Sequence, residues 1–325
     1  MTRRFVAGLK DGEPVDEVFL LTDKQLRANR NASLYLLATL RDRTGTINGL
    51  MWNVREDQCR DFEAGNYVRA KGKVQLYQGS LQVILTHIQR IEATPENTED
   101  FELKPRYGLD KLISRMSEIL RGIEDPAINM LMECFLIDEN LMQRMQRTGG
   151  GIKAHHAYPG GLVEHVVNIL ETAVRIRDLY PEVNFDLLLA GIFLHDIGKV
   201  REMDFDTIFS YTDEGQLLGH MAIGVEMLAE KIAAVEKLTG ERFPDELSLR
   251  LKHMILSHHG IYEHGSSRLP MTPEAIALHH LDNLDAKVHE FSRTINDDPN
   301  TDSAWTPFMP RLDRKIFKGR RPTET

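Results

Sequence analysis

The spacing of apolar residues changes once along this chain of 325 residues, from an alternating pattern to a helical one. From Val18 to Glu92, β-branched and aromatic residues partly alternate with polar ones, with interruptions at Arg43-Thr44-Gly45 and Gln78-Gly79-Ser80. Beyond residue 105, apolar residues recur at intervals of three and four. A chain with these two patterns in succession folds into two unlike domains, one of strands and one of helices.

The strand-rich part has the strand lengths and turns of a small closed barrel. After a first strand near Val18, strands are expected in residues 33–45, 46–54, 66–79 and 80–91. The charged segment 55–65 interrupts them between the third and fourth strands, which is where an OB-fold carries its helix. We therefore predict an N-terminal OB-fold β-barrel in residues 1–92.

The remainder is predicted to be an all-α domain, which makes this a multidomain α and β protein. Residues 93–104 are polar and acidic at first, contain Pro95, and are expected to form a linker. The helical domain is assigned to residues 105–295 and a basic tail to residues 296–325. Beyond an apolar stripe at 109–120, helices are expected at 126–147, 160–179, 186–199, 217–238, 245–258 and 273–295.

Histidine is concentrated in the helical part, since 12 of the 13 histidines lie between His155 and His289. A single histidine on an apolar helix is more often a core residue than a ligand, but here five histidine or aspartate patches lie on separate predicted helices. Asp196 follows His195 inside an apolar helix, where a buried carboxylate is unfavourable unless it is paired or bound to metal. The two cysteines lie 75 residues apart and form neither a disulfide framework nor a thiolate zinc site. The pattern indicates a metal site with nitrogen and oxygen ligands.

The order of these residues, H…HD…H…HH…D with HDIGK at 195–199, resembles the HD superfamily of metal-dependent phosphohydrolases over residues 150–295. A wider set of segments follows the N-terminal barrel and is similar to the YhaM family of 3′→5′ exoribonucleases over nearly the whole chain. These segments are HHAYPGGLVEH, LLAGIFLHDIGKVRE, YTDEGQLLGH, SHHGIYEHGS and HHLDNLDAK.

The resemblance implies a two-metal site and names its ligands. One metal would be held by His165, His195, Asp196 and Asp282. Asp196 would bridge to a second metal, held by His220, His258 and His259. Such a donor set suits divalent ions, with Mn²⁺ as the first choice and Co²⁺, Fe²⁺ or Zn²⁺ as alternatives. Two such ions generate hydroxide from water at neutral pH and stabilise an in-line displacement at phosphorus, which hydrolyses a phosphodiester.

Five further residues are candidates beside the metal ligands. Asp196 and Lys199 are the predicted catalytic residues. Lys199 lies one helical turn beyond His195, where its ammonium would bind a substrate phosphate; the alternative is an exposed lysine at a helix end. Arg268 is a second candidate for phosphate, or a solvated loop residue. Before the first ligand helix, His155, His156 and Tyr158 are expected either to orient metal ligands or contact the substrate, or to have a structural or surface role.

The barrel is expected to bind single strands by stacking bases on aromatic rings over a basic groove. Residues 1–92 carry a net charge of +3 and the remainder −12, and bound metal ions would offset the acidity of the second domain. Trp52 has an alternative place in the barrel core. The candidate platforms are Tyr35, Trp52 and Tyr77, and the candidate phosphate contacts are Lys24, Arg27, Arg30, Lys71 and Lys73.

Together these features predict a 3′→5′ exoribonuclease that converts single-stranded RNA to 5′-mononucleotides. A broader substrate range would also include single-stranded DNA. The longest apolar stretch, residues 187–194, is too short to cross a bilayer, so a cytoplasmic protein without a membrane anchor is expected, and a homo-oligomer is left open. Two alternatives remain: an HD-type nucleotide or cyclic-dinucleotide phosphohydrolase, and a non-catalytic nucleic-acid-binding protein with a structural metal site.

Overall fold

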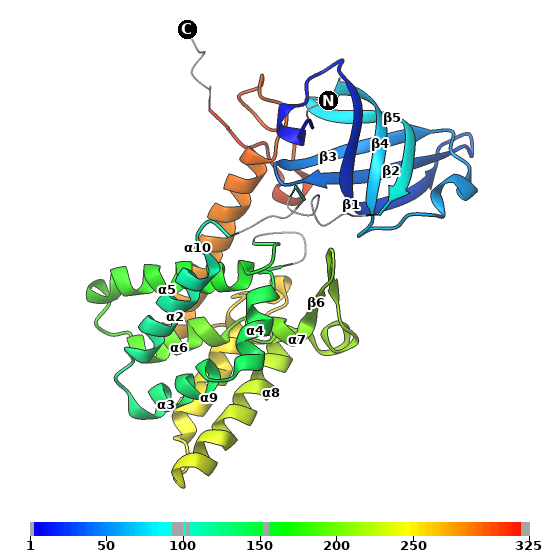
Figure 1. Cartoon of the computed structure of the whole chain (residues 1–325). Coiled ribbons are helices and arrows are strands. Elements are labelled where there is room, and N and C mark those ends of the chain that lie inside the picture. The colour runs from blue at the N-terminus through cyan, green and yellow to red at the C-terminus, as the bar shows by residue number, and fades with distance from the viewer. Residues whose placement is uncertain (1–2, 93–99, 102–104, 152–155, 320–325) are drawn as a thin grey trace. The chain divides into compact units, whose positions relative to one another are not determined.

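The computed structural model describes residues 3–92, 100–101, 105–151 and 156–319 (Figure 1). The described residues form two compact units. The first consists of the described parts of 1–103 and 290–325 together with 206–208, and the second of those of 104–205 and 209–289. The domain limits at 92, 105 and 296 stay predictions. Among the described helices, none combines the length and apolar character needed to cross a membrane.

The predicted closed barrel is confirmed in the first unit. Its strands pair in the order β1-β2-β3-β5-β4, and β4 closes the barrel on β1. The β3 and β5 pair is parallel, whereas the other neighbours are antiparallel. The segment expected to carry a helix forms only the short 3-10 helix η2 (Glu56–Cys59). The strands are β1 (Pro14–Ala28), β2 (Leu34–Asp42), β3 (Gly45–Trp52), β4 (Tyr67–Tyr77) and β5 (Ser80–Ile91).

Alternation along the strands divides the barrel into a packed interior and a solvated outer face. In β2, Leu36, Ala38 and Leu40 are buried, and the residues between them are partly exposed. Because paired residues of neighbouring strands point to the same face, each rung of the sheet is either inside or outside. The side chains of one outer rung can therefore meet a ligand together.

The second unit is helical, as predicted, with a small hairpin of β6 (Met203–Phe205) and β7 (Phe209–Tyr211). Its helices begin with α2 (Leu109–Arg121), α3 (Pro126–Leu136), α4 (Glu139–Arg147), α5 (Gly161–Ile176) and α6 (Phe185–Leu194). They continue with α7 (Lys199–Glu202), α8 (Asp213–Thr239), α9 (Asp245–Ser257) and α10 (Pro273–Asn296), the last of which ends in the first unit. The 3-10 helices of this unit are η3 (Arg177–Leu179) and η4 (Tyr262–His264), and the first unit has η1 (Val6–Gly8) and η5 (Pro310–Leu312) besides η2.

Two predicted helices are shorter in the structure because polar residues and turns break them. The segment 126–147 contains α3 and α4, since the Asp138 carboxylate accepts a hydrogen bond from the Leu141 backbone and starts a new helix. The segment 186–199 contains α6, which ends at Leu194, and the start of α7.

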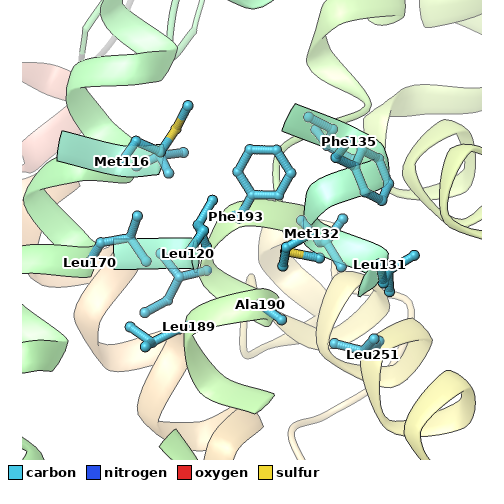
Figure 2. Packing of buried hydrophobic residues seen from close by; sticks show 14 of the residues in the cluster. Met116, Leu120, Leu131, Met132, Phe135, Leu170, Leu189, Ala190, Phe193 and Leu251 are labelled. Carbon is cyan, nitrogen blue, oxygen red and sulfur yellow. The ribbon is translucent and has the colours of Figure 1, made fainter. Parts of the chain in front are cut away.

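The helical core surrounds α6, whose residues are all buried except Asp186 (Figure 2). Phe193 of α6 packs edge to face against Phe135 of α3, with ring centroids 5.6 Å apart. Leu120 of α2 and Leu251 of α9 belong to the same cluster. The most buried helix therefore leads directly into His195 and Asp196, which places these polar residues in the interior.

Candidate metal centre

Five elements bring the predicted metal ligands together. His165 lies on α5, Asp282 on α10 and His220 on α8, while His195 and Asp196 follow α6. His258 and His259 come directly after α9. Among the predicted ligands, two groups of three residues have potential ligand atoms within 4.8 Å of one another. The first group is His165, His195 and Asp282, and the second group is His220, His258 and His259.

Two glycines allow α7 and α8 to approach at this point. A Cβ on Gly198 would lie 2.0 Å from the backbone oxygen of His220, so a larger residue would push the two segments apart. Gly219 interrupts α8 with φ 73°, a left-handed conformation that favours glycine, and His220 follows this break. These glycines explain why HDIGK and LLGH lie side by side.

Asp196 lies between the two groups, and each of its oxygens faces a different pair of histidines. Its Oδ2 is 3.4 Å from His195 Nε2 and 3.9 Å from His165 Nε2. Its Oδ1 is 3.5 Å from His220 Nε2 and 3.7 Å from His258 Nε2. A carboxylate in this position can bridge two cations.

Several potential metal-ligating atoms of this cluster are buried without a hydrogen-bond partner among the residues that the structure describes. They are Nε2 of His195, His220 and His258, Nδ1 of His259 and Oδ1 of Asp196. Each buried polar atom left unsatisfied costs about 1–3 kcal/mol, so five of them in one cluster require a common explanation. Coordination of divalent ions would satisfy them all, and the donor set fits such ions.

In His195 and His258, a hydrogen bond from Nδ1 orients the ring so that Nε2 points into the cluster. The Nδ1 of His195 is 2.7 Å from the Ile192 carbonyl oxygen, and the Nδ1 of His258 is 2.8 Å from that of Ile255. In each case Nδ1 is the donor, which leaves a lone pair on Nε2. The rings are therefore oriented for metal binding before any ion arrives.

Two carboxylates that the sequence analysis overlooked hold other ligands in the same way. Asp285 Oδ2 is 2.7 Å from His165 Nδ1, and its Oδ1 accepts a bond from Asn168 at 3.0 Å. Glu202 accepts a bond from the His220 backbone at 2.9 Å, and its Oε1 is 3.1 Å from His220 Nδ1. Asp285 lies one helical turn beyond Asp282 in HHLDNLDAK, a spacing that could have identified it.

The residues before α5 lie behind His165. His156 is buried with φ 49°, and its Nε2 is 2.9 Å from Asp285 Oδ2. Its other ring nitrogen is 2.9 Å from the Tyr158 hydroxyl, which donates to Glu164 at 2.6 Å. His155 lies outside the described residues. His156 thus contacts the carboxylate that orients His165, and Tyr158 contacts His156 from its other side.

Lys199 is buried at the start of α7, so the alternative of an exposed helix end is wrong. Its Nζ is 2.5 Å from Asp196 Oδ2 and donates to the Gly150 carbonyl oxygen at 2.6 Å. The ammonium therefore contributes positive charge at the carboxylate that lies between the two groups. Arg268, in contrast, is exposed in the loop after η4.

Electrostatics distinguishes the two groups of ligands. Burial alone would raise the pKa of Asp196, but the charges of Lys199, His195 and His220 hold that pKa well below its usual range. Burial lowers the pKa of His258 strongly and that of His259 as well.

At His165, burial would lower the pKa, but the carboxylates of Asp282 and Asp285 outweigh it and raise the pKa to about 9. The second group therefore has neutral histidines at His258 and His259, whereas His165 of the first group carries a proton at pH 7.

In the barrel, three predicted nucleic-acid contacts share one outer rung. Arg27 pairs with Tyr35, and Tyr35 pairs with Trp52 across β1, β2 and β3. The Tyr35 and Trp52 rings lie 5.3 Å apart, and Trp52 is 51% exposed, so its alternative place in the barrel core is wrong. An aromatic pair beside a guanidinium is the arrangement that stacks bases and holds a phosphate.

The other barrel candidates differ in their availability to a ligand. Tyr77, at the end of β4, is exposed, as are Arg30, Lys71 and Lys73. Lys71 forms an ion pair with Asp16 at 3.2 Å. Lys24 is mostly buried, and its Nζ donates to the carbonyl oxygens of Cys59 and Phe62 and to Glu63. Lys24 is therefore engaged inside the barrel.

Comparison with known proteins gives matches for both parts of the chain. Residues 162–287 match the family model of the HD domain, and residues 21–91 match that of an OB-fold nucleic acid binding domain. The chain is 34% identical to the 3′-5′ exoribonuclease YhaM of Bacillus subtilis (strain 168), in an alignment that covers 87% of this chain and 88% of the relative. The corresponding protein of Bacillus velezensis is 35% identical, with coverage of 87% and 88%. That of a Geobacillus species is 33% identical, with coverage of 87% and 86%.

Proposed function

The chain belongs to the YhaM family of 3′-5′ exoribonucleases, and from this premise we propose that it removes 5′-mononucleotides from the 3′ end of single-stranded RNA. The observation that carries the proposal is the position of Asp196 between two groups of potential metal ligands. A carboxylate shared in this way is what a two-metal phosphodiesterase requires. The proposed activity extends to single-stranded DNA as a second substrate.

The proposed ligands divide between two divalent ions. His165, His195 and Asp282 would hold one ion, and His220, His258 and His259 the other, with Asp196 shared by both. The buried donor atoms described above support this division. When bound, such ions supply hydroxide from water at neutral pH and neutralise charge on the phosphate. Mn²⁺ is the proposed ion, with Co²⁺, Fe²⁺ and Zn²⁺ as the other candidates.

The chain's own residues prepare this chemistry. Asp285 and Glu202 orient His165 and His220, and Lys199 favours the ionised form of Asp196. As the other proposed catalytic residue, Lys199 would also attract a phosphate oxygen to the proposed metal ligands, because its ammonium adds positive charge next to them.

The barrel is proposed to hold the single strand. The rung of Arg27, Tyr35 and Trp52 supplies stacking surface and one cation, and Tyr77, Arg30, Lys71 and Lys73 add further exposed contacts. Lys24 is not proposed as a phosphate contact, because its ammonium already donates to two backbone carbonyl oxygens and to Glu63. This surface favours a nuclease over a hydrolase of free nucleotides or cyclic dinucleotides, which would not need it.

The test is degradation of 5′-labelled single-stranded RNA and DNA by the full chain in the presence of Mn²⁺. We expect a ladder that shortens from the 3′ end and is lost in Asp196→Ala. His280→Ala is the matched control because His280 is exposed on α10 and lies outside the ligand groups. A ladder that persists in Asp196→Ala would refute the metal assignment. Hydrolysis of free nucleotides or cyclic dinucleotides but not of oligonucleotides would favour the alternative enzyme. Metal binding without hydrolysis of oligonucleotides, free nucleotides or cyclic dinucleotides would favour a non-catalytic protein with a structural metal site.

A further inference from the structure

The C-terminal part of the first unit forms a hairpin that the proposed function does not use. Trp305 pairs with Phe317 and Met309 with Arg314 in antiparallel bridges. The Thr306 backbone N–H donates to the Ile316 carbonyl oxygen at 2.9 Å, and that of Lys318 donates to the Ala304 carbonyl oxygen at 2.8 Å. Residues 304–318 are called the C-terminal hairpin below.

The two faces of the C-terminal hairpin differ in exposure. Thr306 and Ile316 are buried, whereas the neighbouring pair, Trp305 and Phe317, is 50% and 56% exposed. The Trp305 and Phe317 rings lie side by side, with centroids 4.9 Å apart. Two adjacent aromatic rings that remain half exposed are typical of a binding surface.

Positive charge accompanies the exposed aromatic pair. Lys315 precedes the buried Ile316 and shares the outer side of its strand with Phe317, and the exposed Arg314 comes just before it. Within the described chain, neither cation forms an ion pair with a carboxylate, in contrast to Arg311, which pairs with Glu290. Arg314 Nε donates to the Leu312 carbonyl oxygen at 2.8 Å, which leaves Lys315 as the cation beside the rings. Aromatic rings next to such a cation fit a ligand that has both flat bases and phosphates.

The C-terminal hairpin is attached firmly to the barrel. The partly buried Lys318 donates to Asp298 and to the Asn300 carbonyl oxygen, and the Asn300 side chain donates to the Gly79 carbonyl oxygen at 2.8 Å. Gly79 belongs to the turn between β4 and β5, which begins just after the exposed Tyr77. The hairpin is therefore ordered before a ligand arrives, which reduces the entropy lost on binding.

We propose that the exposed side of the C-terminal hairpin, with Trp305, Phe317 and Lys315, is a second binding surface for single-stranded nucleic acid. This proposal rests on the proposed function, because the strand it binds is the RNA substrate. Bases stack on Trp305 and Phe317, and Lys315 contacts the phosphates. Asn300 links this hairpin to the turn after Tyr77 of the barrel, since it accepts from Lys318 and donates to the Gly79 carbonyl oxygen.

The chain contains two tryptophans, Trp52 and Trp305, so fluorescence can report on each surface separately. In the Trp52→Phe variant, Trp305 is the sole tryptophan, and the full chain is titrated with a uridine 20-mer in EDTA, where hydrolysis does not occur. We expect saturable quenching of Trp305. If Trp305 does not respond while Trp52 responds in the Trp305→Phe variant, the strand contacts only the barrel and the proposal is wrong.

A second experiment separates this surface from catalysis. Trp305→Ala is expected to weaken binding of the 20-mer by about 10-fold, since stacking of one base contributes about 1–3 kcal/mol. Hydrolysis of the small diester bis(p-nitrophenyl) phosphate should not change. Trp305→Phe should retain most of the binding, and equal thermal unfolding of the three proteins checks their folding.

Charge reversal provides an independent variant. Lys315→Glu should weaken binding of the 20-mer, whereas Lys237→Glu, at an exposed position in the last turn of α8, should not. If the Trp305 and Lys315 variants bind the 20-mer normally but change the mass measured by light scattering, the surface joins two copies of the chain and the proposal fails. A wild-type protein that binds the 20-mer through Trp305 but hydrolyses no RNA would refute the proposed activity and leave this surface supported.

Discussion

The carboxylate of Asp285 lies 2.7 Å from Nδ1 of His165, and Nε2 of the same ring faces Asp282 at 3.2 Å. The histidine is thus held between one carboxylate that orients it and another that shares its proposed metal. Because Asp285 also contacts His156 and Asn168, it connects α5 and α10 behind the cluster. This arrangement makes Asp285 the residue most informative about how the first group is positioned.

Replacing Asp285 with Asn should weaken metal binding without removing a ligand. The amide keeps the size of the side chain but loses the negative charge that favours the orientation and basicity of His165. Loss of such a partner typically lowers metal affinity by about 10–100-fold. Calorimetric titration with Mn²⁺ measures the change, and Asn283→Ala, at an exposed position on the same helix, is the control. Equal affinity in wild type and Asp285→Asn would contradict the proposed role.

The raised pKa of His165 predicts that metal binding releases a proton. With a pKa of about 9, His165 is protonated at pH 7.5 in the metal-free protein and must lose this proton to bind an ion. The lowered pKa values of His258 and His259 mean that neither contributes a proton there. Titration in buffers of different ionisation enthalpy should show release from the first group at pH 7.5 that disappears above pH 9. Release that does not change across this range would exclude His165 as its source.

Much of this architecture follows from local sequence, whereas the supporting contacts do not. The ligands at His195 and Asp196 stand out because polar residues inside an apolar helix need a partner. Glu202 gives no such signal, since it looks like a surface carboxylate until α8 is in place, and Asp285 has only its spacing of one helical turn from Asp282. The break at Asp138 was likewise missed, because apolar residues continue at helical spacing on both sides of it. In the barrel, alternation predicted the strands, but only the register showed that Arg27, Tyr35 and Trp52 share a rung.

Lys199→Met should destabilise the metal-free protein more than the metal-bound one. The substitution leaves the buried Asp196 without its nearest cation, a loss that typically costs about 3–5 kcal/mol. Mn²⁺ would restore positive charge at the same carboxylate, so the difference in Tm from wild type should become smaller when the ion is added. Lys231→Met is the control, because its partly exposed pair with Asp138 contributes at most about 1 kcal/mol. An equal loss of Tm with and without Mn²⁺ would show that the lysine acts independently of the metal site.

Gly198→Ala should disrupt the second group of ligands. The added Cβ would lie 2.0 Å from the His220 carbonyl oxygen, so α7 and α8 would have to separate and move His220. Overpacking of this kind costs about 1–3 kcal/mol, and we expect a lower Tm and weaker Mn²⁺ binding. Gly224→Ala is a matched control on α8, since its added Cβ would meet Ile255 at 3.4 Å, an ordinary contact. Similar effects of the two variants would argue against a special role for the close approach at Gly198.

The outer rung of the barrel should contribute to RNA binding in two separable ways. Trp52→Ala removes a stacking surface and should weaken binding of a uridine 20-mer by about 10-fold at every salt concentration. Arg27→Gln removes one phosphate contact, so the slope of log K against log salt should become shallower by about 0.7. Both side chains are exposed on the outer face, and therefore neither change should lower Tm appreciably. Tyr107→Ala, which removes an exposed aromatic ring outside the barrel, is the control for Trp52. If Arg27→Gln weakened binding without changing the salt slope, Arg27 would orient the Tyr35 and Trp52 rings and would not contact phosphate.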